Sequence, residues 1–445
     1  MNLDRQMDLA RTALENSGAD QWEIAAVRSE QVSIGVRGDE VDKFQQSTSS
    51  GLALRVIKDQ RPGFAYVIGG DPAGIARAAA EALASARASD PEPGLTLASP
   101  PEGLPEVETF DPELAADPVE AKVARAKELA AAALAADPRV VHVQPAEFGS
   151  AVSTVRLLSS TGLDFTHQGT TVSAGALAMA SENGEQEMGW DSHSARFLGE
   201  IDPQALGREA GRRAAAFLGA RPVPDGRYQV VLENEVAVQF LGLLAASLQG
   251  DSLLKGRSLL AGREGQEVTS PLVTLVDDGL YPRGLGSGSL DDEGTPMAKK
   301  VLVERGVLAG FIFDRLWGAR AGRASTGNGM RGSLKGPPGV GFSNLYLEPG
   351  PAGRQELESQ MGRGLVISEI MGGHTADPVS GEFSFGAAGF LVEGGRRVRP
   401  VKSIAIAGQV LEVFQAVAGV GSDLKFAGRQ GSPSLLISHM SVSGS

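Results

Sequence analysis

The 445-residue chain contains no cysteine, so it can form no disulfide and offers no thiolate as a metal ligand or nucleophile. It has only five histidines, and aromatic residues make up 5% of it. Basic residues are also scarce: 41 Lys and Arg stand against 54 Asp and Glu, for a net charge of −13. Because nucleic-acid binding requires a basic surface, this balance argues against nucleic acid as a partner.

Long apolar segments are absent from the sequence as well. The longest mostly apolar stretch, Val236 to Leu248, is too short to span a bilayer and contains Gln239. The N-terminus, from Met1 to Gln6, has no apolar core of the signal-peptide type. We therefore expect a cytoplasmic protein with no membrane association.

Glycine, in contrast, is abundant. The 58 glycines are about 13% of the chain, against a typical value of ~7%. Most of the excess falls in the second half, where glycine separates apolar runs and so indicates turns between strands. Hydrophobic residues at 42% and charged residues at 21% describe an ordinary folded protein. The length predicts two or three domains.

Residue periodicity predicts the elements of the N-terminal half. Apolar residues at helical spacing indicate a helix over residues 3–14 that ends near Gly18. Alternating apolar residues then indicate three short strands with turn residues between them, at 22–26, 32–36 and 52–56. Three Asp-Pro pairs predict further helix starts, with aspartate as the N-cap: Asp71-Pro72, Asp117-Pro118 and Asp202-Pro203.

The second half begins with an apolar strand, residues 228–232, and a helix over residues 233–249. A long series of glycine-separated strands follows, so the predicted fold class is α+β. We predict four segments: an N-terminal α+β domain with antiparallel strands (1–89), a Pro/Glu/Gly-rich connector (90–116), a middle α+β domain (117–221) and a β-rich C-terminal domain (222–445).

Several motifs occur in a fixed order along the second half. They are Gly286-Ser-Gly-Ser-Leu-Asp-Asp-Glu-Gly-Thr-Pro296, Ala324-Ser-Thr-Gly-Asn-Gly329, Phe342-Ser-Asn-Leu-Tyr-Leu-Glu-Pro-Gly350, Pro378-Val-Ser-Gly-Glu-Phe-Ser-Phe-Gly386, Pro400-Val401 and Ile406-Ala-Gly408. Their order and spacing resemble the TldD/PmbA family, whose PmbA members are also called TldE. The resemblance implies a peptide-processing metalloprotease formed jointly by a TldD and a TldE subunit.

The same resemblance indicates which of the two subunits this chain is. In TldD-type subunits the helix after the apolar strand carries His-Glu-x-x-x-His, which supplies two zinc ligands and a general base, and a C-terminal cysteine completes the site. An ungapped match back from Gly250-Asp251 places Leu241, Gly242 and Ala246 at these three positions. No histidine lies between His193 and His374, so no shift of register restores the motif.

The resemblance therefore implies a non-catalytic, TldE-type subunit with no cofactor of its own. Zinc is expected in a TldD-like partner, which would form a heteromer with this chain and cleave unfolded or leader peptides. The isolated chain could form a homodimer. The acidic composition gives no support to the family's older description as a modulator of DNA gyrase.

Two other functions remain open from the sequence. The first is an autonomous hydrolase with a relocated metal site, formed from two histidines that each have an aspartate nearby: Asp191 with His193, and His374 with Asp377. The second is a non-enzymatic homodimer that binds or regulates another protein. The other three histidines, His142, His167 and His439, are predicted to be structural.

Two polar loops are the candidate site residues. Asp291, Asp292 and Glu293 could bind a hard cation through oxygen, although a solvated turn is favoured. Because the resemblance is concentrated here, they could also shape a peptide channel or subunit interface. The second loop could bind a peptide or could be a tight turn with glycine at positive φ. It consists of Ser325, Thr326, Gly327, Asn328 and Gly329.

The glycine-rich segment Gly284–Gly288 precedes the acidic triplet. Its backbone N–H groups could hold an anion, but no dinucleotide-type helix follows it. The neighbouring carboxylates would also repel phosphate. We therefore predict an ordinary loop here.

Overall fold

The computed structural model describes residues 2–444, and its first half is built from long strands with helices between them. Its elements are α1 (Leu3–Glu15), β1 (Gln21–Arg37), β2 (Glu40–Lys58), β3 (Arg61–Ile68), α2 (Pro72–Ala88), α3 (Pro112–Ala116), α4 (Val119–Leu134), β4 (Val140–Val143), β5 (Ala146–Ser159), β6 (Asp164–Glu182), β7 (Glu185–Ala195), the 3₁₀ turn η1 (Leu198–Glu200) and α5 (Pro203–Ala216).

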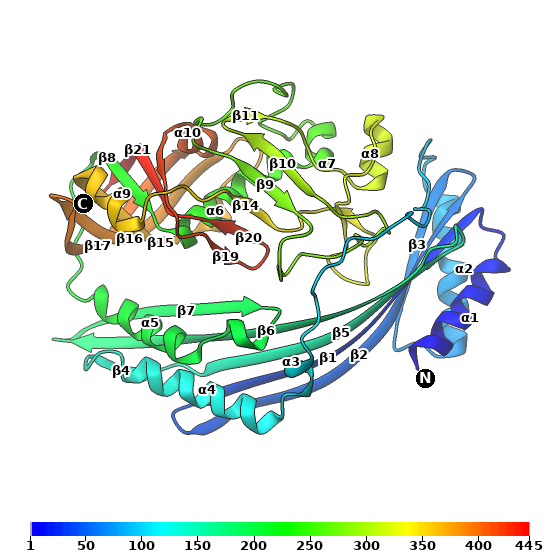
Figure 1. The fold of residues 1–445 in the computed structure, drawn as a ribbon, viewed down its shortest axis with the longest axis horizontal. Coiled ribbons are helices and arrows are strands. Elements are labelled where there is room, and N and C mark those ends of the chain that lie inside the picture. Colours follow the sequence, from blue (N-terminus) through cyan, green and yellow to red (C-terminus); the bar gives the residue numbers. More distant parts are fainter. Residues whose placement is uncertain (1, 445) are drawn as a thin grey trace.

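These strands form one antiparallel sheet in the order β3-β2-β1-β5-β6-β4, with β7 on the free side of β6. In Figure 1 the sheet curves beneath the C-terminal half, and α4 lies on its lower side. It crosses the predicted boundary between the N-terminal and middle domains, because β1 pairs with β5 along most of its length. The domain boundaries themselves remain predictions.

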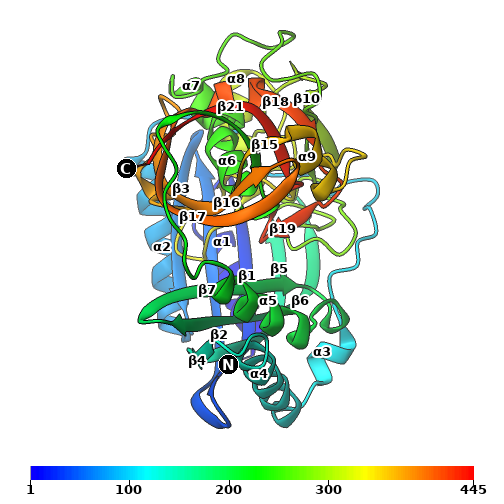
Figure 2. The same ribbon diagram turned by 90° about the vertical axis from the view of Figure 1, so that its left-hand side faces the viewer.

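Strand alternation gives the sheet two different faces. Side chains such as Ile24, Leu54 and Ala176 point toward the helices α1, α2, α4 and α5, where they form two hydrophobic cores. Their neighbours Ala25, Ala53 and Leu157 point the opposite way and form a small core with Leu290 of the C-terminal half. The sheet therefore separates α1, α2 and α4 from the C-terminal half (Figures 1 and 2), whereas α5 also contacts that half through Arg213.

Two details of the sequence prediction for this half are wrong. The runs at 22–26 and 32–36 belong to one 17-residue strand, β1, because its polar middle, including Arg28 and Glu30, pairs with β2 and β5 on both sides. Asp117 does not cap α4, which begins after Pro118. Its carboxylate instead pairs with Lys122 and Arg125, at 3.3 and 2.8 Å.

The second half holds mostly short strands. They are β8 (Gly226–Leu232), β9 (Leu275–Asp278), β10 (Lys299–Glu304), β11 (Val307–Leu308), β12 (Gly329–Met330), β13 (Gly339–Val340), β14 (Leu345–Leu347), β15 (Arg363–Met371), β16 (Glu382–Glu393), β17 (Arg396–Gln409), β18 (Val417–Val420), β19 (Lys425–Ala427), β20 (Gln430–Ser432) and β21 (Leu435–Ser443). The helices are α6 (Asn234–Ala245), α7 (Gly250–Leu254), α8 (Arg315–Ala321), α9 (Arg354–Met361) and α10 (Val410–Gln415), with 3₁₀ turns η2 (Ala246–Leu248) and η3 (Gly373–Thr375).

Two six-stranded sheets organise these elements. One runs β11-β10-β9-β14-β20-β19, and the other runs β17-β16-β15-β8-β21-β18. Because β17 also pairs with β21, the second sheet closes on itself, as Figure 2 shows. The helix α6 packs with both sheets in the largest hydrophobic core. The predicted α+β class and the β-rich C-terminal half are confirmed.

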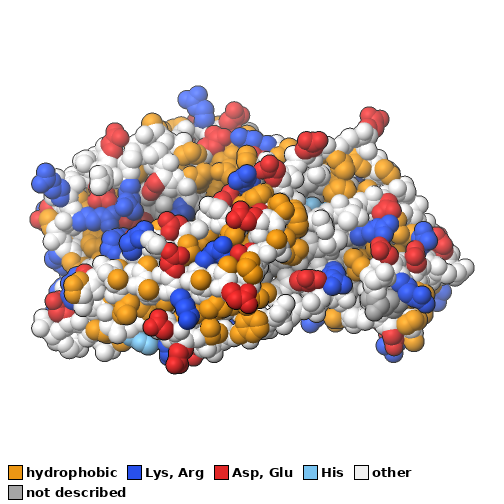
Figure 3. Space-filling model, turned by 60° about the horizontal axis from the view of Figure 1, so that its bottom comes forward, with side chains coloured by type: hydrophobic (Ala, Val, Ile, Leu, Met, Phe, Trp, Pro, Cys, Tyr) orange, Lys and Arg blue, Asp and Glu red, His pale blue; other side chains and the backbone are white. Residues whose placement is uncertain are grey.

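The surface agrees with the charge balance of the sequence. On the face shown in Figure 3, acidic and basic side chains are interspersed with hydrophobic ones, and no continuous basic surface is present there. Within residues 2–444, none of the helices is both long and apolar enough to cross a bilayer.

Candidate functional site

The helix α6 is where the TldD-type zinc motif would lie. It follows the buried strand β8 and is mostly apolar, so its inner face packs into the core. Phe240 makes edge-to-face contacts with Phe383 and Phe385, at ring-centroid distances of 5.0 and 5.9 Å. These contacts fix the rotation of the helix about its axis.

The three motif positions offer no metal ligand. Leu241 is fully buried in the core, and Gly242 and Ala246 are half-buried. A Cβ atom at Gly242 would lie 3.1 Å from the Oε1 of Gln430, so the β20 side chain already occupies the space next to that position. None of the three residues, of which Ala246 lies just past α6 in η2, carries a nitrogen, oxygen or sulfur side-chain donor.

The alternative histidine pairs are not gathered into a metal centre. His193 lies on β7, where burial and then Lys425 lower its pKa. Asp191 is buried and bonded to Lys425 at 3.2 Å, whereas Asp377 accepts a hydrogen bond from the backbone N–H of Val379. Across residues 2–444 the structure contains no group of three His, Cys, Asp or Glu side chains arranged to hold a metal ion.

A cleft of about 530 Å³ lies beside the outer face of α6. Its apolar lining comes from Trp190 of β7, Met371 of β15 and Phe426 of β19. Its polar lining includes Gln239 and the carboxyl group of Glu369, whose pKa is raised by burial. The cleft is therefore amphipathic and lies at the junction of the first sheet and the C-terminal half.

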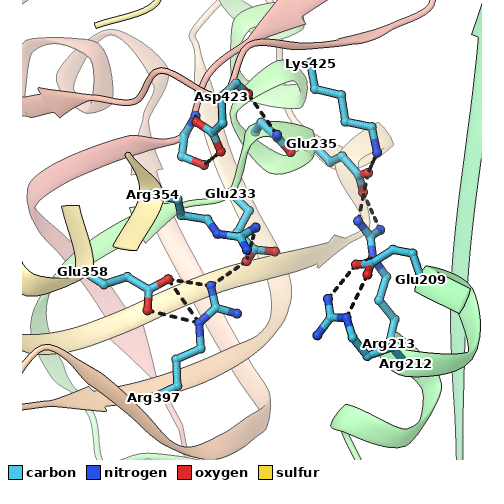
Figure 4. Close-up of polar contacts among 12 residues, drawn as sticks. Glu209, Arg212, Arg213, Glu233, Glu235, Arg354, Glu358, Arg397, Asp423 and Lys425 are labelled. Atoms are coloured by element: carbon cyan, nitrogen blue, oxygen red, sulfur yellow. Dashed lines mark hydrogen bonds and ion pairs between the residues drawn. The ribbon is translucent and has the colours of Figure 1, made fainter. Parts of the chain in front are cut away.

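An ion-pair network forms one end of this cleft (Figure 4). Glu235, in the first turn of α6, accepts bonds of 2.6 and 3.0 Å from Arg213 of α5 and 2.6 Å from Lys425 of β19. Burial alone would raise the pKa of Glu235, but these bonds outweigh burial and the pKa is lowered. Glu235 is thus a fixed anion that joins the middle segment to the C-terminal half.

A second network anchors the N-terminus of α6 (Figure 4). Arg397 of β17 bonds Glu233 at 2.8 Å and Glu358 of α9 at 2.6 Å. Arg354 approaches Glu233 at 3.4 Å. Both networks hold α6 in place with charged groups that the sequence pattern did not single out, because their members are far apart along the chain.

Asp291 and Glu293 of the acidic triplet are buried and Asp292 is half-buried, so the solvated-turn prediction is wrong. Asp291 accepts hydrogen bonds from the backbone N–H groups of Glu293, Thr295 and Gly329. Glu293, 1% exposed, pairs with Arg55 of β2, and Arg55 also bonds Glu23 of β1 at 2.9 Å. The triplet therefore joins the first sheet to the C-terminal half.

Excess negative charge makes this junction unusual. Burial, and then the nearby Glu293, raise the pKa of both Asp291 and Asp314 to about 7. Asp314 is also the N-cap of α8, where it accepts a 2.7 Å bond from the N–H of Trp317. Each of the two carboxyl groups therefore changes its protonation near neutral pH.

The second polar loop is an internal tight turn. Asn328, fully buried, donates bonds of 2.7 Å to Asp277 and 2.9 Å to the carbonyl of Gly341. Gly327 has φ +73°, and a Cβ there would lie 2.5 Å from the carbonyl oxygen of Pro296. A role for either polar loop in a peptide channel or an interface remains a prediction.

We expect Gly327→Ala to lower the free energy of unfolding by about 2–3 kcal/mol, because alanine meets both the positive φ and the Pro296 carbonyl. Gly332→Ala in the nearby exposed loop is the control, since a Cβ there has open space, and should change stability by less than about 0.5 kcal/mol. Chemical denaturation measures both. An equal effect of the two variants would contradict the steric argument.

Comparisons with known proteins identify the family. Three family profiles match almost consecutively: PmbA/TldA metallopeptidase domain 1 at residues 22–86, the central domain at 112–218 and the C-terminal domain at 225–444. The chain therefore belongs to the PmbA/TldD metallopeptidase family. Since it lacks the His-Glu-x-x-x-His motif, it is of the TldE (PmbA) type, as the sequence predicted.

Individual relatives support this assignment. A metalloprotease of Methanothermobacter thermautotrophicus is 30% identical, with 93% of this chain and 92% of the relative aligned. The metalloprotease PmbA of Escherichia coli O157:H7 is 26% identical, over 97% and 95%. A Thermotoga maritima structure described as a modulator of a DNA gyrase superposes with a TM-score of 0.91 at 26% identity, over 99% and 100% of the two chains.

Proposed function

We propose that this chain is the non-catalytic subunit of a heteromeric zinc metalloprotease that cleaves unfolded or leader peptides in the cytoplasm. A TldD-like partner would supply the zinc and the general base. The observation that carries the proposal is that α6 is retained and firmly packed, while its motif positions hold Leu241, Gly242 and Ala246. A helix without ligands can support a neighbouring active site but cannot activate water by zinc.

The packing of α6 supports a structural role for this helix. Leu241 points into the core, and charged residues at the start of the helix are tied to α5, α9 and β17. A rigid helix next to an amphipathic cleft suits a subunit that completes a peptide chamber. The partner would then carry the catalytic residues and the zinc, and this chain would form part of the wall of the peptide chamber.

The test is to purify this chain and the TldD-like protein of the same organism, alone and mixed. We expect no stoichiometric zinc and no cleavage by this chain alone, and a heteromer on size exclusion that cleaves an unfolded peptide. The Ala246→His variant should neither acquire zinc nor restore cleavage in isolation, because the other ligands are absent. Stoichiometric metal with cleavage by the chain alone, or a homodimer that ignores the partner, would refute the proposal.

A further inference from the structure

A second cavity, whose lining differs from that of the cleft beside α6, lies between the first sheet and the loops of the C-terminal half. It has a volume of about 380 Å³, within the range of ligand-binding pockets. The sheet contributes strands β1, β5 and β6, and the loops contribute residues 285–292 and 330–334. The networks around α6 do not include its lining residues.

Arg196, the residue after β7, is a buried cation of this cavity. It is 8% exposed and donates to the backbone carbonyls of Gly284, Leu285 and Ser287, at 2.8–3.1 Å. Its Nη1 atom makes only a long 3.4 Å contact with Thr109. Within residues 2–444 all hydrogen bonds of Arg196 go to backbone carbonyls and none to a carboxylate, although buried charges are ordinarily paired.

The glycine-rich segment Gly284–Gly288 accepts hydrogen bonds from this arginine and has no free N–H groups at its glycines for an anion. Its carbonyl oxygens face Arg196, while the N–H groups of Gly284, Gly286 and Gly288 are bonded to Tyr281, Asn344 and Gly279. The prediction of a loop at 284–288 is therefore confirmed. The positive charge of the cavity comes from side chains.

Arg429 adds a second cation to the same cavity. It is exposed and, in the part of the chain that the structure describes, makes no ion pair. Burial, and then the charge of Arg429, lower the pKa of Arg196 to about 10. Arg331 also lines the cavity but is paired with Glu23 at 2.8 Å. Asp292 accepts a hydrogen bond from the N–H of Arg331; burial raises the pKa of Asp292, and the charges of Arg331 and Arg429 partly offset that rise. Asp291 and Asp292 also line the cavity, but neither Arg196 nor Arg429 forms an ion pair within residues 2–444.

The guanidinium of Arg196 lies close over Gly169 of β6, next to His167. A Cβ at this position would lie 3.1 Å from the Nη1 of Arg196 and 3.5 Å from the Nε2 of His167. The pKa of His167 is lowered by burial and then by Arg196, so the ring is neutral near pH 7. The Nη1 group of Arg196, which has only the long contact with Thr109, therefore lies beside the His167 ring.

The remaining wall is apolar. Leu157, Phe165, Leu290 and Leu334 belong to the small core that joins the sheet to the C-terminal half, and all four line the cavity. A free inorganic anion would make no apolar contact with this wall. The lining suits a ligand with a carboxylate at one end and an apolar group next to it.

We propose that this cavity binds the C-terminal end of a peptide, with its carboxylate between Arg196 and Arg429 and its last apolar side chain against Phe165 and Leu334. The choice of a peptide rests on the proposed function, whereas the carboxylate chemistry rests on the cavity. The site would hold one end of an extended substrate or product while the partner acts on another part of it.

The experiment titrates the purified full-length chain with acetyl-Ala-Leu-Leu as its free acid, with the corresponding amide, and with inorganic phosphate, by isothermal calorimetry. We expect the acid to bind at least about ten-fold more tightly than the amide. Arg429→Gln should abolish that preference without changing amide binding. Arg363→Gln, whose arginine is 82% exposed on β15, is the matched control and should change neither.

A second variant leaves both charges in place but displaces one of them: Gly169→Ala should weaken the binding of the acid by a similar factor, because its Cβ would lie 3.1 Å from the Nη1 of Arg196 and push the guanidinium aside. Equal binding of acid and amide, no binding of either, or an Arg429→Gln variant with wild-type preference would overturn the proposal. Tight phosphate binding that the peptide acid does not displace would also overturn it. Cleavage by the heteromer is measured separately, so loss of this site and loss of the proposed function are distinguishable.

Discussion

Replacement of Arg55 by methionine is expected to lower the free energy of unfolding by about 3–5 kcal/mol. Arg55 is the cation between Glu23 and Glu293, whose side chains are each 1% exposed. Methionine keeps the apolar volume of the side chain but leaves Glu293 with only the backbone N–H of Arg315 as a hydrogen-bond donor. The loss should concentrate at the junction between the first sheet and the C-terminal half.

Urea denaturation measures this loss, and hydrogen exchange of β2 and residues 291–295 locates it. Arg28→Met on β1 is the control, since the Arg28–Glu30 pair is about half exposed and should contribute no more than about 1 kcal/mol. Adding Glu293→Gln to Arg55→Met should recover part of the loss, because glutamine still accepts from Arg315 without carrying a buried charge. A loss equal to that of Arg28→Met would show that the junction is not held by this network.

Asp314→Asn is expected to stabilise the protein at neutral pH and above, by about 2–3 kcal/mol relative to its effect at pH 5. The pKa of Asp314 is about 7 in the folded chain, mainly because of burial and the nearby Glu293. Its ordinary value is 3.8. Asparagine keeps the hydrogen bond to the N–H of Trp317 and is a favourable N-cap, so the change removes mainly the charge.

The direction follows from proton linkage. A carboxyl group whose pKa is raised on folding stabilises the native state below about pH 4, and this contribution is lost as the pH rises to about 7. The stability difference between Asp314→Asn and wild type should therefore grow between about pH 4 and 7 and stay level above pH 7. Asp202→Asn, at the exposed N-cap of α5, should give a nearly constant difference. A flat profile for Asp314→Asn would refute the raised pKa.

Local sequence patterns predicted the elements that depend on neighbouring residues. The cap residue Asp71 starts α2, Asp202 starts α5, and the apolar run after β8 forms α6. The lack of zinc ligands at Leu241, Gly242 and Ala246 could also be predicted from the sequence, because it depends only on residue types at a known spacing. Periodicity failed at β1, where a polar middle is held in the strand by partners on both sides.

The buried charges were beyond the reach of the sequence. Asp291, Asp292 and Glu293 look like a solvated turn to any local rule, yet Glu293 is paired with Arg55, 238 residues away. No local sequence pattern predicts that Arg196 is buried, because it is buried by the loop that contains Gly284, 88 residues further along the chain. Long-range pairing decides whether an acidic or basic residue is solvent-exposed or interior.

The sequence by itself determined the family, the α+β class and the missing zinc motif, because each is carried by residue identity and short-range order. Tertiary structure alone decided which charges are buried, which are paired, and that Arg196 and Arg429 share a cavity with an apolar wall. The physical reason is that a charge is set by its residue type, whereas its desolvation and its partners are set by segments distant in the chain.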